Sequence, residues 1–259
     1  MKEDSQSFLP QHNRQYLDAA YWDARFQKED EYEWFKAFAE FRHLLLPHLK
    51  RGDKILILGC GNSLLPLDLW REGFREITSV DLSPAVIQKM AARAEAEGVD
   101  SLKWQVADML SLPFQADTFD AVIEKGTMDV LFVDNDSPWD PNPEVRSRVL
   151  TMLDETHRVL KAEGVFLSIT FAQPHFRRPF LLVERYAWGM EVASFGEGFH
   201  YFLYCMRKGA RKASDHPSHF AQNGKPVEAL DGNQGTGQAT ESSMHDHMDS
   251  ADYILSMDV

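Results

Sequence analysis

Two glycines, two aspartates and a lysine stand at the ends of apolar segments in the first half of the chain. They are Gly59, Gly61, Asp81, Asp108 and Lys125. Glycines between a strand and a helix let backbone N–H groups approach a ligand closely, and a carboxylate about 20 residues later can accept hydrogen bonds from a ribose diol. The second aspartate can accept from an adenine amino group. We therefore expect a pocket for a ligand that contains adenosine.

The segments around these residues alternate between strand and helix. Apolar runs predict strands at 54–58, 77–80, 102–106, 119–123 and 165–170, and helical patterns predict helices at 64–72, 84–97 and 144–160. Ser83 and Pro84 are typical of a helix start, as N-cap and first-turn proline. This alternation predicts a doubly wound, mostly parallel α/β sheet with the charged residues at its carboxyl edge. Two last strands, at 186–195 and 199–206, complete seven and predict an antiparallel hairpin on the sheet edge.

The glycine turn helps to distinguish between two cofactors that commonly bind at such an edge. Dinucleotide-binding turns have the pattern Gly-x-Gly-x-x-Gly, in which the third glycine lets helix and strand pack closely. Leu64 takes that place here. One adenosine ligand that contacts the ends of four strands matches S-adenosylmethionine better. Taken singly, these glycines could be plain turn formers and these acids plain helix caps, but the ordered set favours the cofactor.

Composition and charge narrow the function further. The 259 residues include 44% hydrophobic ones and carry a formal net charge of −13. An acidic protein is a poor partner for nucleic acid or an anionic membrane, and a basic, lysine-bearing protein is a more natural one. Cys60 and Cys205 do not make a disulfide framework, the N-terminus has no apolar signal region, and no apolar run approaches the ~20 residues of a membrane span. We expect a soluble, cytoplasmic protein.

Four motifs resemble those of the seven-strand, Rossmann-like class I methyltransferases. They are "ILILGCGNS", "SVDLS", "VADM" and "FDAVIEKGTMD". The N-terminal "YWDARF" and "YEWF" and the later "PHFRRP" and "GEGFHYFLY" are more specific, and resemble the eukaryotic lysine methyltransferases that modify elongation factor 1-alpha. The mitochondrial citrate synthase lysine methyltransferase shares much of the same pattern. The resemblance covers residues 16–208 and implies S-adenosyl-L-methionine as the cofactor and a protein lysine as the methyl acceptor.

The same resemblance implies a set of cofactor contacts. These contacts fall on Trp22, Phe26, Trp34, Gly59, Asp81, Leu82, Asp108, Met109 and Lys125. Gly61, the second glycine of the turn, is a further expected cofactor contact. Phe26 stands where a tyrosine is usual in the family, so a hydrogen bond from that hydroxyl is absent. Trp22 and Phe26 lie four apart on one helix face, while Trp34, Phe35, Phe38 and Phe41 predict a second helix. Aromatic faces suit a sulfonium cation and an adenine ring, and plain core packing is the alternative for each tryptophan.

Methyl transfer to an amine is an in-line displacement that needs an aligned, neutral nucleophile. A lysine ammonium loses its proton more readily in a dry aromatic pocket, so a dedicated strong base is not required. Glu124 and Asp129, at the end of the fourth strand, are the candidate catalytic residues that orient the incoming ammonium. Capping of the short helix after Gly126 is the alternative role for both.

Three further features bear on the substrate. Enzymes that methylate planar amide or base nitrogens often carry Asn/Asp-Pro-Pro-Tyr/Phe after the fourth strand, whereas this chain has "EKGT" there. Together with the acidic charge, this argues against a nucleic-acid substrate. No Cys/His cluster has metal-ligand spacing, so we expect no metal. A loop with Asp134, Asp136, Asp140 and Glu144 could steer a basic target or simply be solvated.

The chain divides into three predicted segments. Residues 1–14 form a flexible leader, residues 15–208 a methyltransferase domain whose helices at 15–50 cover the cofactor, and residues 209–259 a mostly disordered polar tail. The expected function is N-methylation of a lysine on elongation factor 1-alpha by a monomeric enzyme. The alternatives are another protein target such as citrate synthase, a small-molecule substrate, and a non-catalytic cofactor-binding scaffold.

Overall fold

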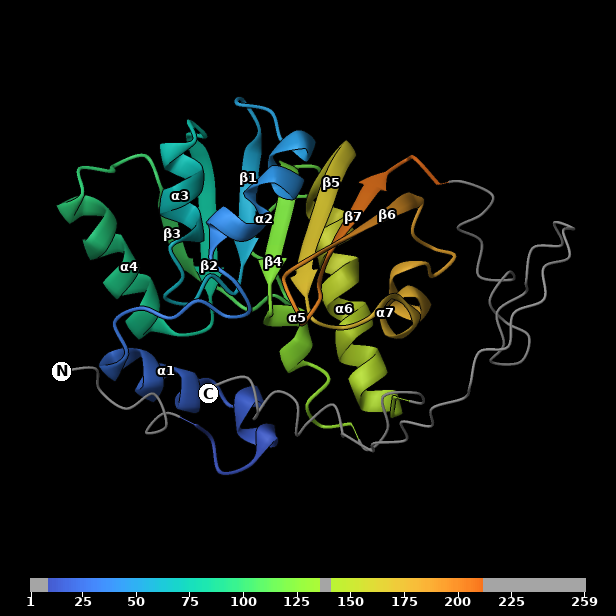
Figure 1. Cartoon of the computed structure of the whole chain (residues 1–259), viewed down its shortest axis with the longest axis horizontal. Coiled ribbons are helices and arrows are strands. Elements are labelled where there is room, and N and C mark those ends of the chain that lie inside the picture. The colour runs from blue at the N-terminus through green and yellow to red at the C-terminus, as the bar shows by residue number, and fades with distance from the viewer. Residues whose placement is uncertain (1–8, 136–140, 212–259) are drawn as a thin grey trace, which may run out of the picture.

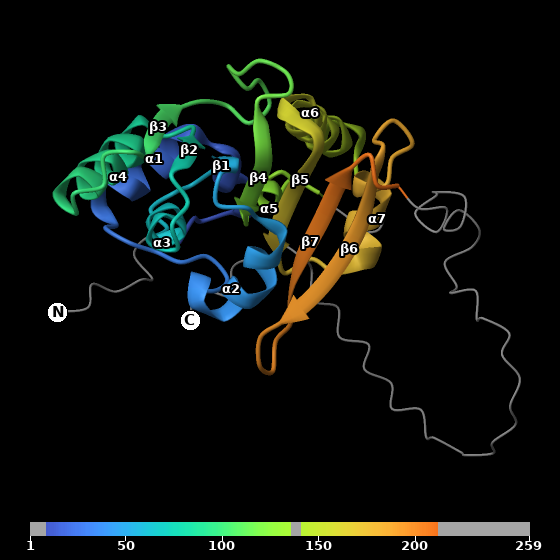
Figure 2. The same cartoon turned by 90° about the horizontal axis from the view of Figure 1, so that it is seen from above.

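The computed structural model describes residues 9–135 and 141–211. A seven-stranded sheet forms the centre of this part, and helices lie on both of its faces (Figures 1 and 2). Residues 1–8 of the predicted leader, residues 212–259 of the predicted tail, and the loop acids Asp136 and Asp140 lie outside the described residues. Within the described part, no helix is both long and apolar enough to cross a bilayer.

The observed strands follow the predicted ones closely. They are β1 (Lys54–Leu58), β2 (Glu76–Asp81), β3 (Lys103–Val106), β4 (Phe119–Lys125), β5 (Leu160–Thr170), β6 (Trp188–Phe195) and β7 (Tyr201–Lys208). Their order in the sheet is β3-β2-β1-β4-β5-β7-β6. The first five pair in parallel, and β7 runs antiparallel to both β5 and β6. The predicted doubly wound sheet with an antiparallel hairpin is confirmed, and its switch point lies between β1 and β4.

Helices cover both faces and the carboxyl edge of the sheet. They are α1 (Ala19–Lys28), α2 (Phe38–Leu45), α3 (Leu65–Arg71), α4 (Pro84–Ala96), α5 (Thr127–Val130), α6 (Pro143–Val159) and α7 (Pro174–Leu181), with 3-10 turns η2 (Asn13–Leu17) and η3 (Leu46–His48). Ser83 caps α4 by accepting a hydrogen bond from the Val86 N–H at 3.3 Å, and Pro84 occupies the first turn, as predicted.

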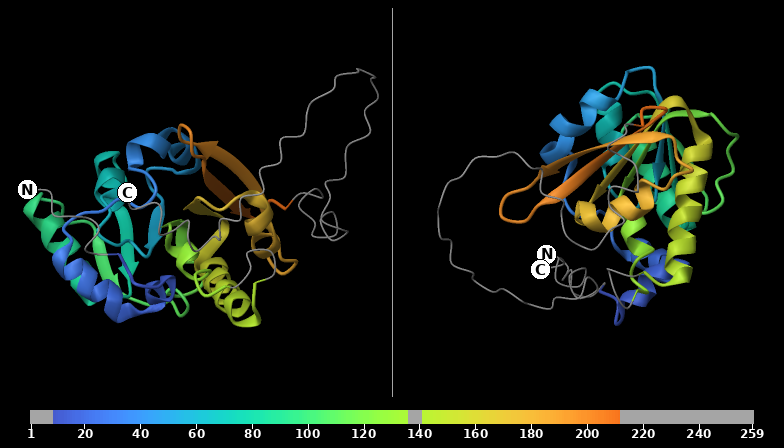
Figure 3. Two further views of the ribbon diagram at one scale, coloured as in Figure 1. Left: turned by 60° about the horizontal axis from the view of Figure 1, so that its bottom comes forward. Right: turned by 90° about the vertical axis from the view of Figure 1, so that its right-hand side faces the viewer.

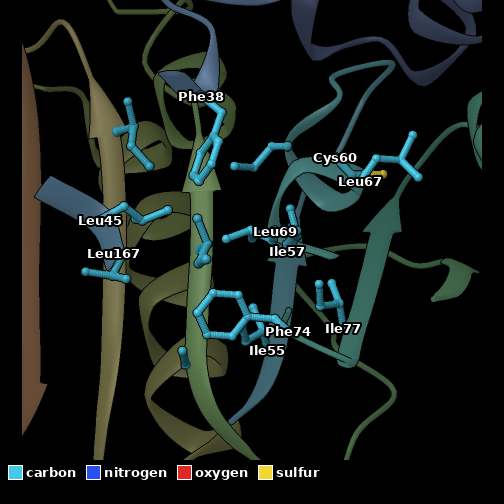
Figure 4. Close-up of a cluster of buried hydrophobic side chains, with 14 of the residues drawn as sticks. Phe38, Leu45, Ile55, Ile57, Cys60, Leu67, Leu69, Phe74, Ile77 and Leu167 are labelled. Atoms are coloured by element: carbon cyan, nitrogen blue, oxygen red, sulfur yellow. The ribbon is translucent and has the colours of Figure 1, made fainter. Parts of the chain in front are cut away.

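β1 lies at the centre of two hydrophobic clusters, one on each face of the sheet. Ile55 and Ile57 point to one face and pack with α2 and α3, where Figure 4 shows Phe38, Leu45, Leu67 and Leu69 around them. Leu56 and Leu58 point to the other face, where α6 contributes Val149, Met152 and Leu153. All four β1 side chains are at most 2% exposed. Apolar burial at about 25 cal/mol per Å² therefore fixes the strand from which the glycine turn departs.

α1 lies along the carboxyl edge of the sheet rather than on a face. In Figure 1 it lies below the sheet, on the side to which the arrowheads of β4 and β5 point. Figure 3 shows it beside α4, against which it packs. The N-terminal residues therefore reach the edge at which parallel α/β sheets bind ligands.

Two segments differ from the prediction. Trp34 and Phe35 lie in a loop before α2 instead of on a helix, because the Trp34 carbonyl accepts from the Lys125 ammonium at 2.8 Å and Phe35 has a φ of +67°. The helix α7 was not predicted, because its segment contains two prolines. Pro174 stands in the first turn, where a missing N–H costs nothing, and Pro179 stands in the last turn.

Candidate active site

One pocket collects every residue that was predicted to contact the cofactor. It lies at the carboxyl ends of β1, β2 and β4 and has a volume of about 280 Å³. Its walls include Trp22, Phe26, Trp34, Gly59, Gly61, Asp81, Leu82, Asp108, Met109 and Lys125. Asp129, predicted as catalytic, also lines it, whereas Glu124 does not.

The glycine turn after β1 has no room for a side chain at Gly59, and its backbone conformation favours glycine at both positions. Gly59 and Gly61 have φ values of +58° and +50°, in the left-handed region that favours glycine. A Cβ on Gly59 would lie 2.3 Å from Cγ2 of Thr127, and one on Gly61 would lie 3.5 Å from the Phe26 ring. The Cys60 N–H donates to the Val80 carbonyl at 3.0 Å, which ties the turn to β2. The turn therefore exposes backbone to the pocket.

The two strand-end aspartates hold their loops and still have acceptor capacity. Asp81 accepts from the Gly61 N–H at 2.9 Å and from the Ser83 N–H at 3.0 Å, one bond on each oxygen. Burial raises the pKa of this carboxyl. Asp108 accepts from the Leu110 N–H at 2.8 Å. A carboxylate has about four lone-pair sites, so both groups can accept further hydrogen bonds from a ligand.

Aromatic side chains cover the pocket from the N-terminal side. The Trp22 ring stacks on Tyr16 and on Phe26, with ring centroids 5.5 Å apart in both pairs, and its indole N–H donates to the Tyr16 carbonyl at 2.7 Å. Trp34 meets Trp22 edge-on at 6.0 Å. Arg25 lies at 5.2 Å from the Trp34 ring and is buried. We call residues 18–37, which carry Trp22, Arg25, Phe26 and Trp34, the N-terminal cover.

Glu33 is a pocket-edge residue that the sequence analysis missed. Its carboxylate accepts from the Leu64 N–H at 2.7 Å, from the Ser63 hydroxyl at 2.8 Å and from the Lys125 ammonium at 2.9 Å. Burial lowers the pKa of Lys125, while the charge of Glu33 opposes that shift. The signal in the sequence was a charged residue inside the aromatic run "YEWF" together with a lysine at a buried strand end.

Glu124 lies beneath the pocket and caps the helix that follows. Its side chain is fully buried, and one oxygen accepts from the Thr127 N–H at 3.0 Å and the Met128 N–H at 3.1 Å. The other oxygen accepts from the Ser168 hydroxyl. Burial, followed by repulsion from Asp129, raises the pKa of Glu124 to about 7. This arrangement is the capping role, which the sequence left open as the alternative to catalysis.

Asp129 faces the pocket and is held by Arg177, a pairing that the sequence did not predict. Its Oδ1 accepts from the Thr170 hydroxyl at 2.6 Å and from the Arg177 guanidinium. Its Oδ2 is buried and makes no hydrogen bond with any residue the structure describes. Burial raises the pKa of Asp129, and the Arg177 charge opposes the rise. A buried carboxylate oxygen at a pocket wall is a natural acceptor for a cationic ligand.

The two described acids of the acidic loop, Asp134 and Glu144, both form ion pairs. Asp134 pairs with Arg14 at 3.3 Å and with Arg148 at 3.6 Å, and Glu144 also pairs with Arg148, at 3.3 Å. Among the described residues, no group of three or more His, Cys, Asp or Glu side chains could hold a metal ion.

The chain belongs to the methyltransferase family, because the family described as "Methyltransferase domain" matches residues 49–190, more than half of its length. It is 42% identical over 204 residues to EEF1A lysine methyltransferase 4 of Mus musculus, a match that covers 78% of this chain and 79% of that protein. It is 33% identical over 172 residues to the eEF1A lysine and N-terminal methyltransferase of Mus musculus, covering 65% of this chain and 24% of that protein.

Solved structures agree with the fold. A SAM-dependent methyltransferase from Aquifex aeolicus superposes with a TM-score of 0.51 at 16% identity, over 71% of this chain and 97% of that one. The predicted family resemblance, the Rossmann-like fold and the methyltransferase activity are therefore confirmed.

Proposed function

We propose that this methyltransferase transfers a methyl group from S-adenosyl-L-methionine to a lysine side chain of elongation factor 1-alpha. The names of the two mouse relatives support the choice of substrate, since both are named as lysine methyltransferases of that factor. The observation that carries the proposal is the pocket itself. It combines a glycine turn, two strand-end carboxylates, an aromatic cover and the Asp129 carboxylate in one space.

The residues around the pocket fit the cofactor. We assign Asp81 to the ribose diol and Asp108 to the adenine amino group, while the turn at Gly59 and Gly61 leaves room for the backbone to approach. Trp22 and Trp34 bring aromatic surface to the pocket wall, which suits a sulfonium cation. When bound, the cofactor supplies an electrophilic methyl group. The protein's own contribution is orientation and the exclusion of water.

We assign Asp129 to the substrate ammonium. Its Oδ2 lies buried without a described partner. Burial raises the pKa of this carboxyl, the Arg177 charge opposes the rise, and an entering cation favours the ionised form further. The nearby rings of Trp34, Phe35 and Phe171 line the same pocket and keep it apolar. Desolvation by such walls lowers the pKa of an entering ammonium, while the Asp129 charge raises it. The amine loses its proton to water before it attacks where desolvation outweighs that charge. Glu124 acts as a positioning residue that fixes α5, and with it Asp129.

The compartment that suits this reaction is the cytoplasm. Cys60 and Cys205 are both free and buried thiols, which fits a reducing environment.

The test is methylation of purified elongation factor 1-alpha with this protein and the cofactor, mapped by mass spectrometry. We expect added methyl mass on a single lysine, and far less in the same time with the Asp129→Asn variant. A wild-type protein that binds S-adenosylhomocysteine but leaves the factor unmodified would refute this substrate. Transfer to citrate synthase or to a small molecule under the same conditions would favour those alternatives.

A further inference from the structure

Acidic side chains fasten the N-terminal cover to the loops that follow β1 and β2. Asp23 accepts from the Ser83 hydroxyl at 2.7 Å and so reaches the start of α4. Glu29 accepts from the Asn62 side-chain amide at 3.0 Å. Glu33 is the third such acid. These are directional, charge-assisted contacts, in contrast to the apolar packing of the sheet.

Glu33 differs from the other two because it also contacts Lys125, at the end of β4. One oxygen accepts from the Leu64 N–H, and the other accepts from the Lys125 ammonium. The same ammonium donates to the Trp34 carbonyl at 2.8 Å. Lys125 therefore binds the side chain of Glu33 and the backbone of the next residue, Trp34. The Lys125 side chain is 5% exposed and the Glu33 side chain 20%. One carboxylate therefore joins the cover, the glycine-turn loop and β4.

A carboxylate is the group that this position requires. Leu64 and Lys125 approach different oxygens, and the Ser63 hydroxyl lies within hydrogen-bond distance of both. An amide in the same place would offer one acceptor and turn its NH₂ group toward a donor. It would also leave the Lys125 charge buried without its counter-ion, which is unfavourable.

We propose that Glu33 is a positioning residue of the cofactor pocket, which sets Trp34 over the pocket by tying the cover to Lys125 and to the loop after Gly61. The inference rests on the proposed use of this pocket for the cofactor. Glu33 itself performs no chemical step. Its loss should raise the KM for S-adenosylmethionine while kcat at saturating cofactor changes little.

The chain offers a matched control in Glu31. This residue belongs to the same cover and pairs with Arg93 of α4 at 2.7 Å, but both side chains are more than 30% exposed. Such pairs contribute little to stability. Both Glu33→Gln and Glu31→Gln therefore remove one negative charge from the cover. Glu33→Gln removes it from a buried contact, and Glu31→Gln removes it from an exposed one.

The experiment is calorimetric titration of wild type, Glu33→Gln and Glu31→Gln with S-adenosylhomocysteine, with melting temperatures measured in parallel. We expect Glu33→Gln to bind at least tenfold more weakly, Glu31→Gln to bind within twofold of wild type, and both to melt cooperatively. Equal affinities of the two variants would overturn the role of Glu33. If wild type itself does not bind, the proposed function fails first, so the two failures are distinguishable.

Two further measurements separate positioning from a general loss of fold. Limited trypsin digestion without ligand should cut after Lys28 or Lys36 at least fivefold faster in Glu33→Gln than in Glu31→Gln, and equal rates would count against the proposal. Glu33→Asp keeps the charge on a shorter arm and should recover part of the affinity. No recovery, in a variant that melts like wild type, would also contradict the role of the charge.

A double-mutant cycle tests whether Lys125 acts together with Glu33. If it does, Glu33→Gln combined with Lys125→Met should weaken binding no more than the worse single variant does. Losses that multiply would mean that Lys125 and Glu33 act independently, and would overturn the role of this buried contact.

Discussion

The sheet core and the N-terminal cover are held in place by different balances of apolar packing and hydrogen bonds. β1 is held by side chains that are at most 2% exposed and by ladders to β2 and β4. The cover contributes Phe26 to the same core and packs Trp22 and Phe35 against it, but carboxylates such as Asp23 and Glu33 make many of its attachments, to the start of α4 and to the loop after β1. Apolar burial is non-directional and large in sum, whereas each hydrogen bond contributes only about 1 kcal/mol net.

The difference has a consequence for ligand binding. Regions with few buried apolar contacts open at lower free energy than core strands do. We therefore expect the cover to separate from the sheet edge more readily than any strand leaves the sheet. A pocket between such a cover and a rigid edge can admit a ligand without unfolding of the domain.

The largest expected effect is that of removing the cover. Deletion of residues 1–35 takes away Trp22, Phe26, Trp34 and Glu33 but leaves α2 and all seven described strands. We expect loss of methyl transfer and of measurable S-adenosylhomocysteine binding, while circular dichroism still reports a cooperative melt at a lower temperature. Deletion of residues 1–8 is the control and should keep activity. A truncated protein that still binds the ligand at full affinity would show that the carboxyl edge of the sheet binds the cofactor without the cover.

The next largest effect concerns Asp129, the predicted catalytic residue that lines the pocket. Asp129→Asn keeps the shape but removes the negative charge that we assign to the substrate ammonium. We expect kcat to fall roughly 100-fold, in the range typical of the loss of one electrostatic contact at the reacting group, with cofactor affinity nearly unchanged. Asp134→Asn, in the loop that follows, should leave kcat within about twofold. A change in cofactor affinity instead of kcat would show that Asp129 acts on the cofactor and not on the substrate.

The same contrast explains what the sequence could predict. The apolar run of β1, the turn glycines and the Ser83-Pro84 helix start are local patterns, and all of them appear in the structure at the expected positions. A strand buried on both faces reads as a continuous apolar run, and parallel strands end at one edge. Asp81 and Asp108 could therefore be brought to one pocket from spacing alone.

The cover could not be predicted in the same way. Its conformation depends on contacts between residues far apart in the chain, such as Glu33 and Lys125, which are 92 positions apart. The aromatic pattern suggested a helix through Trp34 and Phe35, but the Lys125 bond to the Trp34 carbonyl decided otherwise. The pairing of Arg177 with Asp129 was not predicted for a similar reason, since Asp129 lies 48 positions away, on α5. Tertiary contacts overrode local propensity at both places.

A smaller effect is expected at the rigid edge. Asp81→Ala removes the acceptors that we assign to the ribose, and a charged hydrogen-bond partner contributes about 1.5–3 kcal/mol. Calorimetry should show S-adenosylhomocysteine binding roughly ten- to hundredfold weaker. Because Asp81 also holds Gly61 and Ser83, a moderate loss of melting temperature should accompany it. An unchanged affinity would remove Asp81 from the cofactor site.

The smallest effect concerns the one strand-end carboxylate that belongs to the core rather than to the pocket lining. Glu124 has a pKa raised to about 7 by burial, against an ordinary value of 4.5. Below pH 4.5 it is protonated in both the folded and the unfolded chain. As the pH rises, the unfolded chain loses this proton first, so the free energy of unfolding falls between about pH 4.5 and 7 and then levels off.

Glu124→Gln should remove that pH dependence without loss of the fold. Both backbone donors, Thr127 and Met128, bond to the same oxygen, so an amide oxygen can accept from both while its NH₂ group donates to the Ser168 hydroxyl. Melting temperatures measured from pH 5 to pH 8 should fall by a few degrees less in the variant than in wild type, on the order of 3–6 °C. Parallel curves for the two proteins would show that Glu124 ionises in the fold as it does in the unfolded chain. The variant should also retain most of the methyl-transfer activity, because a capping group needs only to accept the α5 N–H bonds, whereas a residue that orients an ammonium needs its charge.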